Sequence, residues 1–234
     1  MTDTRNKRAI VLLSGGVDST TVLAIARREV EECIAITFIY GQKHAAEVDA
    51  AARIAEKMGV EKHLIIPISL GQCVVSALTD ETIPVPKGGA CVSCDPGIPP
   101  TYVPARNTIF LSHALAIAES TGSGTIYIGV SSVDYSGYPD CRPEFIRAFQ
   151  RLAELATKSA VEGLPVRIRA PLLNLSKAET IREGLRLGVD YSLTLSCYEP
   201  GTDGRPCGEC DSCRLRRRGF EEAGVNDPAC RRNS

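Results

Sequence analysis

The sequence has little that points to a membrane, a secretory route or a nucleic acid. Its apolar runs all fall well short of the about 20 residues needed to cross a bilayer. Residues 1–8 are polar and charged and contain no apolar stretch, so a signal peptide is not expected. The formal net charge of −1 gives no overall basic field that would attract nucleic acid. These absences predict a cytoplasmic protein with neither nucleic-acid nor membrane partners.

Two common nucleotide-binding signatures are also missing from the first strand-to-helix junction. Residues 14–19 read Ser-Gly-Gly-Val-Asp-Ser, so there is no Gly-Lys-Ser/Thr of a Walker A loop and no Gly-x-Gly-x-x-Gly fingerprint. The junction follows an apolar run at 9–13, typical of a strand buried on both faces. It precedes a helical pattern at 20–28. The sequence therefore predicts a different kind of glycine-containing loop between strand and helix.

Such a loop can present backbone N–H groups and the positive end of a helix dipole to a phosphate. Glycine allows the backbone to approach the ligand closely, and the Asp18 carboxylate can hold Mg²⁺ or cap the helix. The alternative is a turn that binds nothing, which a lone glycine pair would suggest. We interpret the stretch as a phosphate-binding loop. It resembles the PP-loop of the ATP pyrophosphatases, and this resemblance implies that ATP is bound by Leu13, Ser14, Gly15, Gly16, Val17, Asp18, Ser19, Thr20, Thr21, Val22 and Leu23.

Strands and helices are expected to alternate along the chain. Further apolar runs at 33–39, 63–68, 125–130 and 166–170 read as strands, with helices predicted at 45–58, from Asn107 onward and at 145–161. This order predicts a Rossmann-like α/β fold: a parallel five-stranded sheet with helices on both faces and ligands at its carboxyl edge. We expect a catalytic domain at 1–190, with a Pro/Gly-rich lid-like loop at 79–106, and a smaller subdomain at 191–234.

Polar segments follow several of these strands. Aromatic faces can stack on a planar heterocycle, carboxylates can accept its N–H protons, and arginine can bind a carboxylate or phosphate. Asn107 is also a candidate helix N-cap. An ordinary polar turn, or a solvated arginine, is the plain alternative. The candidate substrate-binding residues are Tyr40, Gln42, His44, Arg106, Asn107, Tyr135, Tyr138, Asp140, Arg142 and Glu144.

Lys177 is placed unusually for a lysine. Ser176 and Glu179 have the spacing of a capping box, which puts Lys177 in the first helical turn, where the helix dipole disfavours a cation. A bound polyphosphate would resolve this conflict, so we interpret Lys177 as a pyrophosphate ligand; a surface lysine is the alternative. Lys177 is therefore a candidate catalytic residue.

Four of the 10 cysteines are clustered near the end of the chain. Cys197, Cys207, Cys210 and Cys213 have gaps that allow their sulfurs to converge on one tetrahedral ion. A structural Zn²⁺ site is expected, with an Fe–S cluster as the alternative and disulfides disfavoured in a reducing compartment. Cys91 and Cys94 form a half-site that we interpret as structural or incidental, and Cys230 as inert. Arg214, Arg216, Arg217 and Arg218 are interpreted as a solvated helix face.

Taken together, these segments resemble the 7-cyano-7-deazaguanine synthase (ExsB-type) family within the PP-loop ATP pyrophosphatases. The resemblance rests on the loop at 14–21, Tyr-Gly-Gln-Lys-His at 40–44, Val-Pro-Ala-Arg-Asn at 103–107, residues 134–145 and the four cysteines. The loop with Cys91 and Cys94 and the short arginine-bearing tail depart from the family pattern.

This resemblance implies an ATP-dependent C–N ligase of queuosine biosynthesis. It would convert 7-carboxy-7-deazaguanine and ammonia to 7-cyano-7-deazaguanine (preQ0) through adenylated intermediates and an amide. ATP with Mg²⁺ would be the co-substrate, with Asp18 and Asp134 as candidate Mg²⁺ ligands. By the same resemblance, the candidate catalytic residues are Asp18, Arg106, Asp134 and Lys177. A homodimer is usual in the family. Two rivals are a tRNA-modifying PP-loop enzyme, for which no basic face is evident, and a nucleotide-binding regulator.

Overall fold

The computed structural model describes residues 7–43, 46–71, 73–88, 97–131 and 137–231. Five parallel strands form one sheet, as the alternating pattern predicts, and their order is β3-β2-β1-β4-β5. The strands are β1 (Arg8–Leu12), β2 (Glu32–Ile39), β3 (Lys62–Pro67), β4 (Thr125–Tyr127) and β5 (Arg167–Arg169). The last two are shorter than the apolar runs at 125–130 and 166–170, so pairing stops before those runs end.

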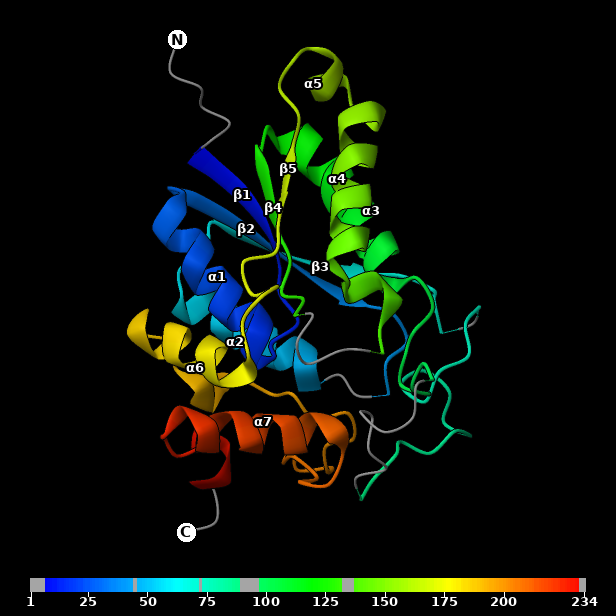
Figure 1. Ribbon diagram of the computed structural model, residues 1–234, viewed down its shortest axis with the longest axis vertical. Helices are drawn as coiled ribbons and strands as arrows, with labels where there is room; N and C mark the ends of the chain where they lie inside the picture. The colour runs from blue at the N-terminus through cyan, green and yellow to red at the C-terminus, as the bar shows by residue number, and fades with distance from the viewer. Residues whose placement is uncertain (1–6, 44–45, 72, 89–96, 132–136, 232–234) are drawn as a thin grey trace.

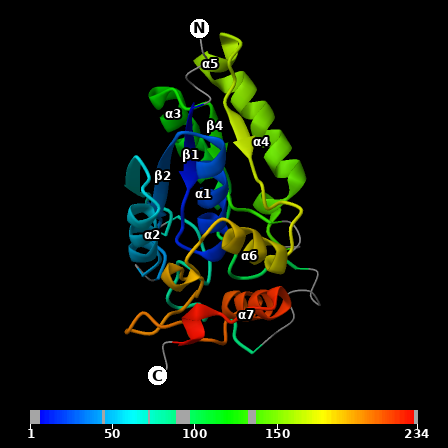
Figure 2. The same ribbon diagram turned by 90° about the vertical axis from the view of Figure 1, so that its left-hand side faces the viewer.

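Helices cover both faces of the sheet (Figures 1 and 2). One hydrophobic core lies between the sheet and the helices α1 (Val17–Glu29) and α2 (Ala46–Lys57). A second core lies between the sheet and the helices α3 (Arg106–Thr121) and α4 (Pro143–Ala156). This is the doubly wound arrangement that brings loops to the carboxyl edge of the sheet.

The helix expected over 145–161 is divided in two. Helix α4 ends at Ala156, and Thr157 takes an extended conformation, with its hydroxyl accepting a hydrogen bond from the backbone N–H of Ala160. Thr157 thereby caps a separate short helix, α5 (Lys158–Val161). A threonine that bonds its own backbone competes with helix continuation, which is the physical reason for the break.

The last part of the chain packs beneath the carboxyl edge of the sheet (Figure 1). Helix α6 (Lys177–Arg186) begins with the predicted capping box between Ser176 and Glu179. Helix α7 (Asp211–Ala223) lies against α6, and two 3₁₀ turns, η3 (Tyr191–Leu193) and η4 (Pro228–Arg231), complete the segment. A third 3₁₀ turn, η2 (Pro139–Cys141), precedes α4. Among the described residues, no helix is long and apolar enough to span a membrane.

Candidate active site

The loop between β1 and α1 packs directly against α2. Gly15 has φ of 84°, and a Cβ there would lie 2.6 Å from the backbone oxygen of Glu47 and 2.8 Å from the backbone nitrogen of Ala51. Both the left-handed conformation and the close approach therefore require glycine. The hydroxyls of Ser14 and Ser19 form a hydrogen bond of 3.0 Å, which fixes the two ends of the loop relative to each other. The result is a rigid turn that opens onto the N-terminus of α1.

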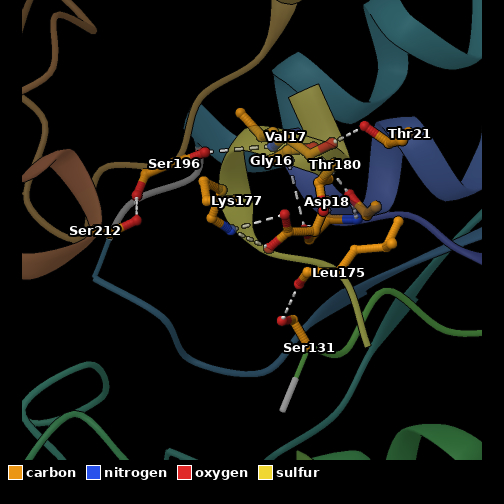
Figure 3. A network of polar contacts seen from close by, with 12 residues as sticks. Gly16, Val17, Asp18, Thr21, Ser131, Leu175, Lys177, Thr180, Ser196 and Ser212 are labelled. Carbon is orange, nitrogen blue, oxygen red and sulfur yellow. Dashed lines mark hydrogen bonds and ion pairs between the residues drawn. The ribbon is translucent and has the colours of Figure 1, made fainter. Parts of the chain in front are cut away.

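The N-terminus of α1 is capped by a residue from the far end of the chain. Gly16 occupies the N-cap position and has no side chain to offer. Instead, the Ser196 hydroxyl accepts a hydrogen bond from the Val17 N–H at 3.3 Å, and the Leu195 N–H donates to the Gly15 carbonyl at 2.9 Å. The Ser212 hydroxyl in turn donates to the Ser196 carbonyl (Figure 3). The segment next to Cys197 therefore holds the loop between β1 and α1, the predicted phosphate loop, in place.

Asp18 and Lys177 form an ion pair beside this loop. Lys177 Nζ lies 2.7 Å from each carboxylate oxygen of Asp18, and the two side chains are only 10% and 20% exposed for Lys177 and Asp18 respectively (Figure 3). Helix α7 packs on the lysine so closely that a Cβ at Gly219 would clash with Lys177 Cγ. In this structure the Asp18 carboxylate offsets the conflict between Lys177 and its helix dipole.

A cavity of about 230 Å³ opens between the loop and the carboxyl ends of β2 and β4. It brings together the loop, the N-terminus of α3 and the segment at 195–198. Of the predicted residues it includes Leu13, Ser14, Gly16, Val17, Asp18, Ser19, Tyr40, Gln42, Arg106, Asn107 and Tyr138. Thr20, Thr21, Val22 and Leu23 are instead buried in α1, where they pack the helix rather than face the cavity.

Two of the predicted substrate-binding residues lie on the protein surface, away from this cavity. Arg142 and Glu144 are exposed, with Glu144 paired to Arg147 at 2.9 Å and Arg142 donating to the Pro139 carbonyl. His44, Asp134, Tyr135, Cys91 and Cys94 lie outside the described residues. Gln42 lines the cavity but uses its amide on the backbone of Tyr40 and Phe38, so it also braces the end of β2.

Asp140 caps helix α3. Its carboxylate accepts a hydrogen bond from the Asn107 N–H at 2.9 Å, and the Asn107 side-chain amide donates to the Asp140 carbonyl at 3.0 Å. The interpretation of Asn107 as the N-cap is wrong, because Ala105 holds that position and Asn107 is the second helical residue. A carboxylate from another segment satisfies the N–H group that a local cap would have taken.

This arrangement predicts the effect of Asp140→Ala. Losing the cap should cost about 1–2 kcal/mol and lower the melting temperature by several degrees, because the buried N–H of Asn107 is left without an acceptor. Differential scanning calorimetry would measure this. Glu144→Ala, which removes an exposed carboxylate paired with Arg147 rather than with α3, serves as the control and should leave the melting temperature nearly unchanged. Equal melting temperatures for Asp140→Ala and wild type would contradict the capping role.

Arg106 and Glu47 both lie on the cavity wall. Arg106 donates to the Tyr40 hydroxyl at 3.3 Å and lies over the Tyr40 ring at 5.7 Å. Burial raises the pKa of Glu47 to about 7, and the nearby Arg106 guanidinium opposes that rise. Sequence reasoning missed Glu47, Ser196 and Ser212. Nothing in their local sequence marks them, since each reaches the site only through packing between segments distant in the chain.

The four C-terminal cysteines converge as their spacing predicts. The sulfurs of Cys197, Cys207, Cys210 and Cys213 all lie within 4.8 Å of one another. Sulfurs around a tetrahedral Zn²⁺ would stand about 3.8 Å apart, given Zn–S bonds of about 2.3 Å. The Cys197 sulfur accepts hydrogen bonds from the N–H groups of Cys207 and Glu199 at 3.2 and 3.4 Å. Such donors stabilise thiolate, so this donor set suits a metal ion.

The arginine run on α7 is not uniformly solvated. Arg214, Arg217 and Arg218 are exposed, but Arg216 is only 4% exposed, so the solvated-face interpretation is wrong for that residue. Arg216 binds both carboxylate oxygens of Asp227 at 2.8 and 2.9 Å and donates to the carbonyls of Thr194 and Tyr191. It therefore fastens α7 and η4 to the chain just before the cysteine segment.

Arg216→Ala is expected to destabilise the protein by roughly 3–5 kcal/mol, because Asp227 would be left as a buried charge without its partner. Arg216→Lys should recover only part of this loss, since an ammonium cannot reproduce the two-pronged contact. Urea unfolding gives the free energies, with exposed Arg214→Ala as the control. If Arg216→Ala and Arg214→Ala proved equally stable, the fastening role would be wrong.

The fold and the loop geometry define a class: doubly wound α/β proteins with a parallel sheet and a glycine-containing strand-to-helix loop at its carboxyl edge. The solved NMN synthetase from Francisella tularensis is similar in fold, with a TM-score of 0.50 at 14% identity, covering 95% of this chain and 79% of that one. At this identity the likeness concerns the fold alone.

Sequence comparison identifies the family. The model for the queuosine biosynthesis protein QueC matches residues 8–224. A 7-cyano-7-deazaguanine synthase from Frankia casuarinae is 60% identical over 94% of this chain and 92% of its own length. Another from Saccharophagus degradans is 56% identical over 95% and 97%. The chain belongs to the QueC family of queuosine biosynthesis proteins, as the motifs predict.

Proposed function

We propose that this protein is a 7-cyano-7-deazaguanine synthase that converts 7-carboxy-7-deazaguanine and ammonia to the nitrile at the expense of ATP. The observation that carries the proposal is the ion pair between Asp18 and Lys177. It lies at the N-terminus of α1, next to the glycine-containing loop that follows β1. These are groups suited to Mg²⁺ and to a polyphosphate. Membership of the QueC family supports the choice of substrate.

The chemistry follows from the need for a leaving group. A carboxylate oxygen of the substrate attacks the α-phosphorus of ATP, the bond to the β-phosphate oxygen breaks, and pyrophosphate leaves. Ammonia attacks the resulting acyl-adenylate, a proton is lost, and AMP departs to give the amide. The amide oxygen then attacks the α-phosphorus of a second ATP, pyrophosphate leaves, and the nitrogen loses one proton. Loss of AMP together with the last proton on nitrogen forms the C≡N bond.

This chain's residues contribute charge and position to these steps. The backbone around Gly15 and Gly16 would hold the phosphates, and Lys177 would neutralise the departing pyrophosphate, a form of electrostatic stabilisation that is strong in a partly buried site. Mg²⁺, when bound at Asp18, would supply further neutralisation. Lys177 is paired with Asp18 in this structure. With Mg²⁺ held by Asp18, the Lys177 ammonium would be available to bind phosphate oxygens instead.

The C-terminal cysteines would hold one structural Zn²⁺. The convergence of four sulfurs with backbone donors supports zinc, since a closed four-cysteine set is typical of structural zinc sites. The metal would keep residues 195–198 against the phosphate loop, and we propose 191–234 as the zinc-binding subdomain on that basis. A homodimer remains a prediction that light scattering would test.

The decisive experiment incubates the purified protein with 7-carboxy-7-deazaguanine, ammonium and Mg-ATP. Mass spectrometry should find the nitrile, and nucleotide analysis should find two AMP and two pyrophosphate per nitrile. ADP in place of AMP would contradict cleavage between the α- and β-phosphates. AMP released only when tRNA is supplied would move the protein to the tRNA-modifying branch of the class.

A further inference from the structure

The proposed substrate has one edge that the site must recognise. A 2-amino-4-oxopyrimidine ring presents two kinds of N–H donor, the ring N–H and the 2-amino group, next to an oxo acceptor. A carboxylate beside a guanidinium is the complement of that edge, because the carboxylate only accepts hydrogen bonds and the guanidinium only donates them. An unengaged carboxylate in the cavity, together with an arginine, would supply that complement.

The described carboxylates that the substrate motif suggests are already engaged. Asp140 accepts from the N–H of Asn107 and is not part of the cavity lining, and Glu144 is exposed and paired with Arg147. The carboxylate of Asp18 is taken by Lys177 on the phosphate side. Of the carboxylates that line the cavity in the described part of the chain, this leaves Glu47.

Glu47 has the placement that the substrate edge requires. It lies in the first turn of α2, and its backbone oxygen is packed against Gly15, so its position is tied to the phosphate loop. Its carboxylate makes no hydrogen bond or ion pair with any residue that the structure describes. Arg106 shares the cavity with Glu47, and the only described partner of its guanidinium is the Tyr40 hydroxyl, which leaves further N–H donors available.

Three aromatic rings share the cavity with Glu47 and Arg106. The rings of Phe38 and Phe110 are stacked, with 4.2 Å between their centroids and 13° between their planes. The centroid of the Tyr40 ring lies 5.5 Å from that of Phe110. All three line the same cavity as Glu47 and Arg106. Flat apolar surface of this kind suits the face of a fused bicyclic ring. The wall at the end of β2 thus combines an aromatic surface with an acceptor and a donor.

The environment of Glu47 disfavours the ionised form of its carboxyl group when the cavity is empty. Loss of water raises its pKa to about 7, against the effect of Arg106, so ionising it in the empty site is costly. Hydrogen bonds from a ligand's N–H groups would favour the ionised form. A carboxyl group whose ionisation is costly in the empty site, and becomes favourable when a ligand donates hydrogen bonds to it, is typical of a recognition site.

We propose that Glu47 and Arg106 together recognise the pyrimidine edge of the deazapurine, the Glu47 carboxylate accepting from the ring N–H and the 2-amino group while Arg106 donates to the oxo group. The inference rests on the proposed function and specifies the substrate orientation within that site. In this orientation the 7-carboxylate of the substrate points away from β2, toward Ser14 and Asp18 in the loop between β1 and α1.

The test uses Glu47→Gln, which keeps the size of the side chain but removes its charge and replaces one acceptor with a donor. Isothermal titration calorimetry should find 7-carboxy-7-deazaguanine bound about 10–100-fold more weakly than by wild type. The KM for ATP should stay within about threefold. Asp49→Asn, at an exposed acidic residue two positions along the same helix, is the matched control and should behave as wild type.

A second ligand distinguishes loss of a specific contact with the 2-amino group from a general disturbance of the cavity. The analogue that lacks the 2-amino group should bind wild type about 10–100-fold more weakly than 7-carboxy-7-deazaguanine does. Glu47→Gln should bind the two compounds with affinities within a few-fold, because the group that distinguishes them is gone. The variant should also melt at the same or a higher temperature than wild type at pH 8, since it no longer carries a costly charge.

The outcomes distinguish the inference from the function on which it rests. If wild type turns over 7-carboxy-7-deazaguanine while Glu47→Gln binds it equally well, the inference is wrong and the function stands. The inference is also wrong if the variant raises only the KM for ATP or for ammonium. If wild type neither binds nor converts the compound, the proposed function fails and the inference fails with it.

Discussion

Cys210→Ser is expected to remove the metal from the C-terminal cysteine cluster and to weaken ATP binding at the same time. Cys210 is fully buried among the other three sulfurs, so the loss of one thiolate should lower metal affinity by more than about 100-fold. Without the metal, the segment at 195–198 loses its anchor. The hydrogen bonds from Leu195 to Gly15 and from Val17 to Ser196 should then no longer be maintained.

The measurements separate the local effect from unfolding. Atomic absorption should find about one metal ion per wild-type chain and almost none in the variant after dialysis against a chelator. The Kd for ATP should rise about tenfold or more as the cap of α1 is lost. Far-UV circular dichroism should change little, because the strands and α1–α4 do not depend on the cluster. Cys73→Ser, which alters an exposed thiol, should match wild type in all three measurements.

Two results would contradict this expectation. A variant that retains a full equivalent of metal would exclude Cys210 as a ligand. A variant that loses the metal but binds ATP normally would show that the phosphate loop keeps its shape without the segment beside Cys197. Removal of the metal from wild type with a chelator should reproduce the loss of ATP affinity, and zinc alone should restore it.

The second large effect is expected for Lys177→Met, which should lower kcat by about 10²–10³-fold. The apolar methionine keeps the length of the stem that packs under Gly219 but cannot neutralise pyrophosphate as it departs. The KM for ATP should change less than kcat, because the charge to be stabilised is greatest as the bond breaks. Steady-state kinetics of pyrophosphate release would measure both quantities.

Lys177→Met also leaves the partly buried Asp18 carboxylate without its partner, which should lower stability. The double variant Asp18→Asn with Lys177→Met separates the two effects, since it should recover stability but not activity. Lys158→Met, at an exposed lysine on α5, is the control for a lost surface charge. A kcat within about threefold of wild type would show that Lys177 serves only to pair with Asp18.

The sequence by itself determined the parts of this protein that depend on near neighbours. The apolar runs and helical spacing placed five parallel strands and their helices, although Thr157 divided one helix and the last two strands are shorter than their runs. The capping box at Ser176 and Glu179 formed as its spacing predicts. The cysteine spacing brought four sulfurs together. In each case the interacting groups lie within about 17 residues or repeat with the period of one element.

Only the tertiary structure decided which distant groups meet. Asp140 caps the helix that Asn107 was expected to cap, Arg216 turns inward to Asp227 while its neighbours face solvent, and Lys177 pairs with Asp18 across 159 residues. Ser196 reaches the N-terminus of α1 from 179 residues away, and Glu47 enters the cavity because α2 packs on Gly15. The physical reason is that local patterns specify which face of an element is buried. The partners of a buried polar group are set by the packing of whole elements, and a buried charge must find one wherever the fold provides it.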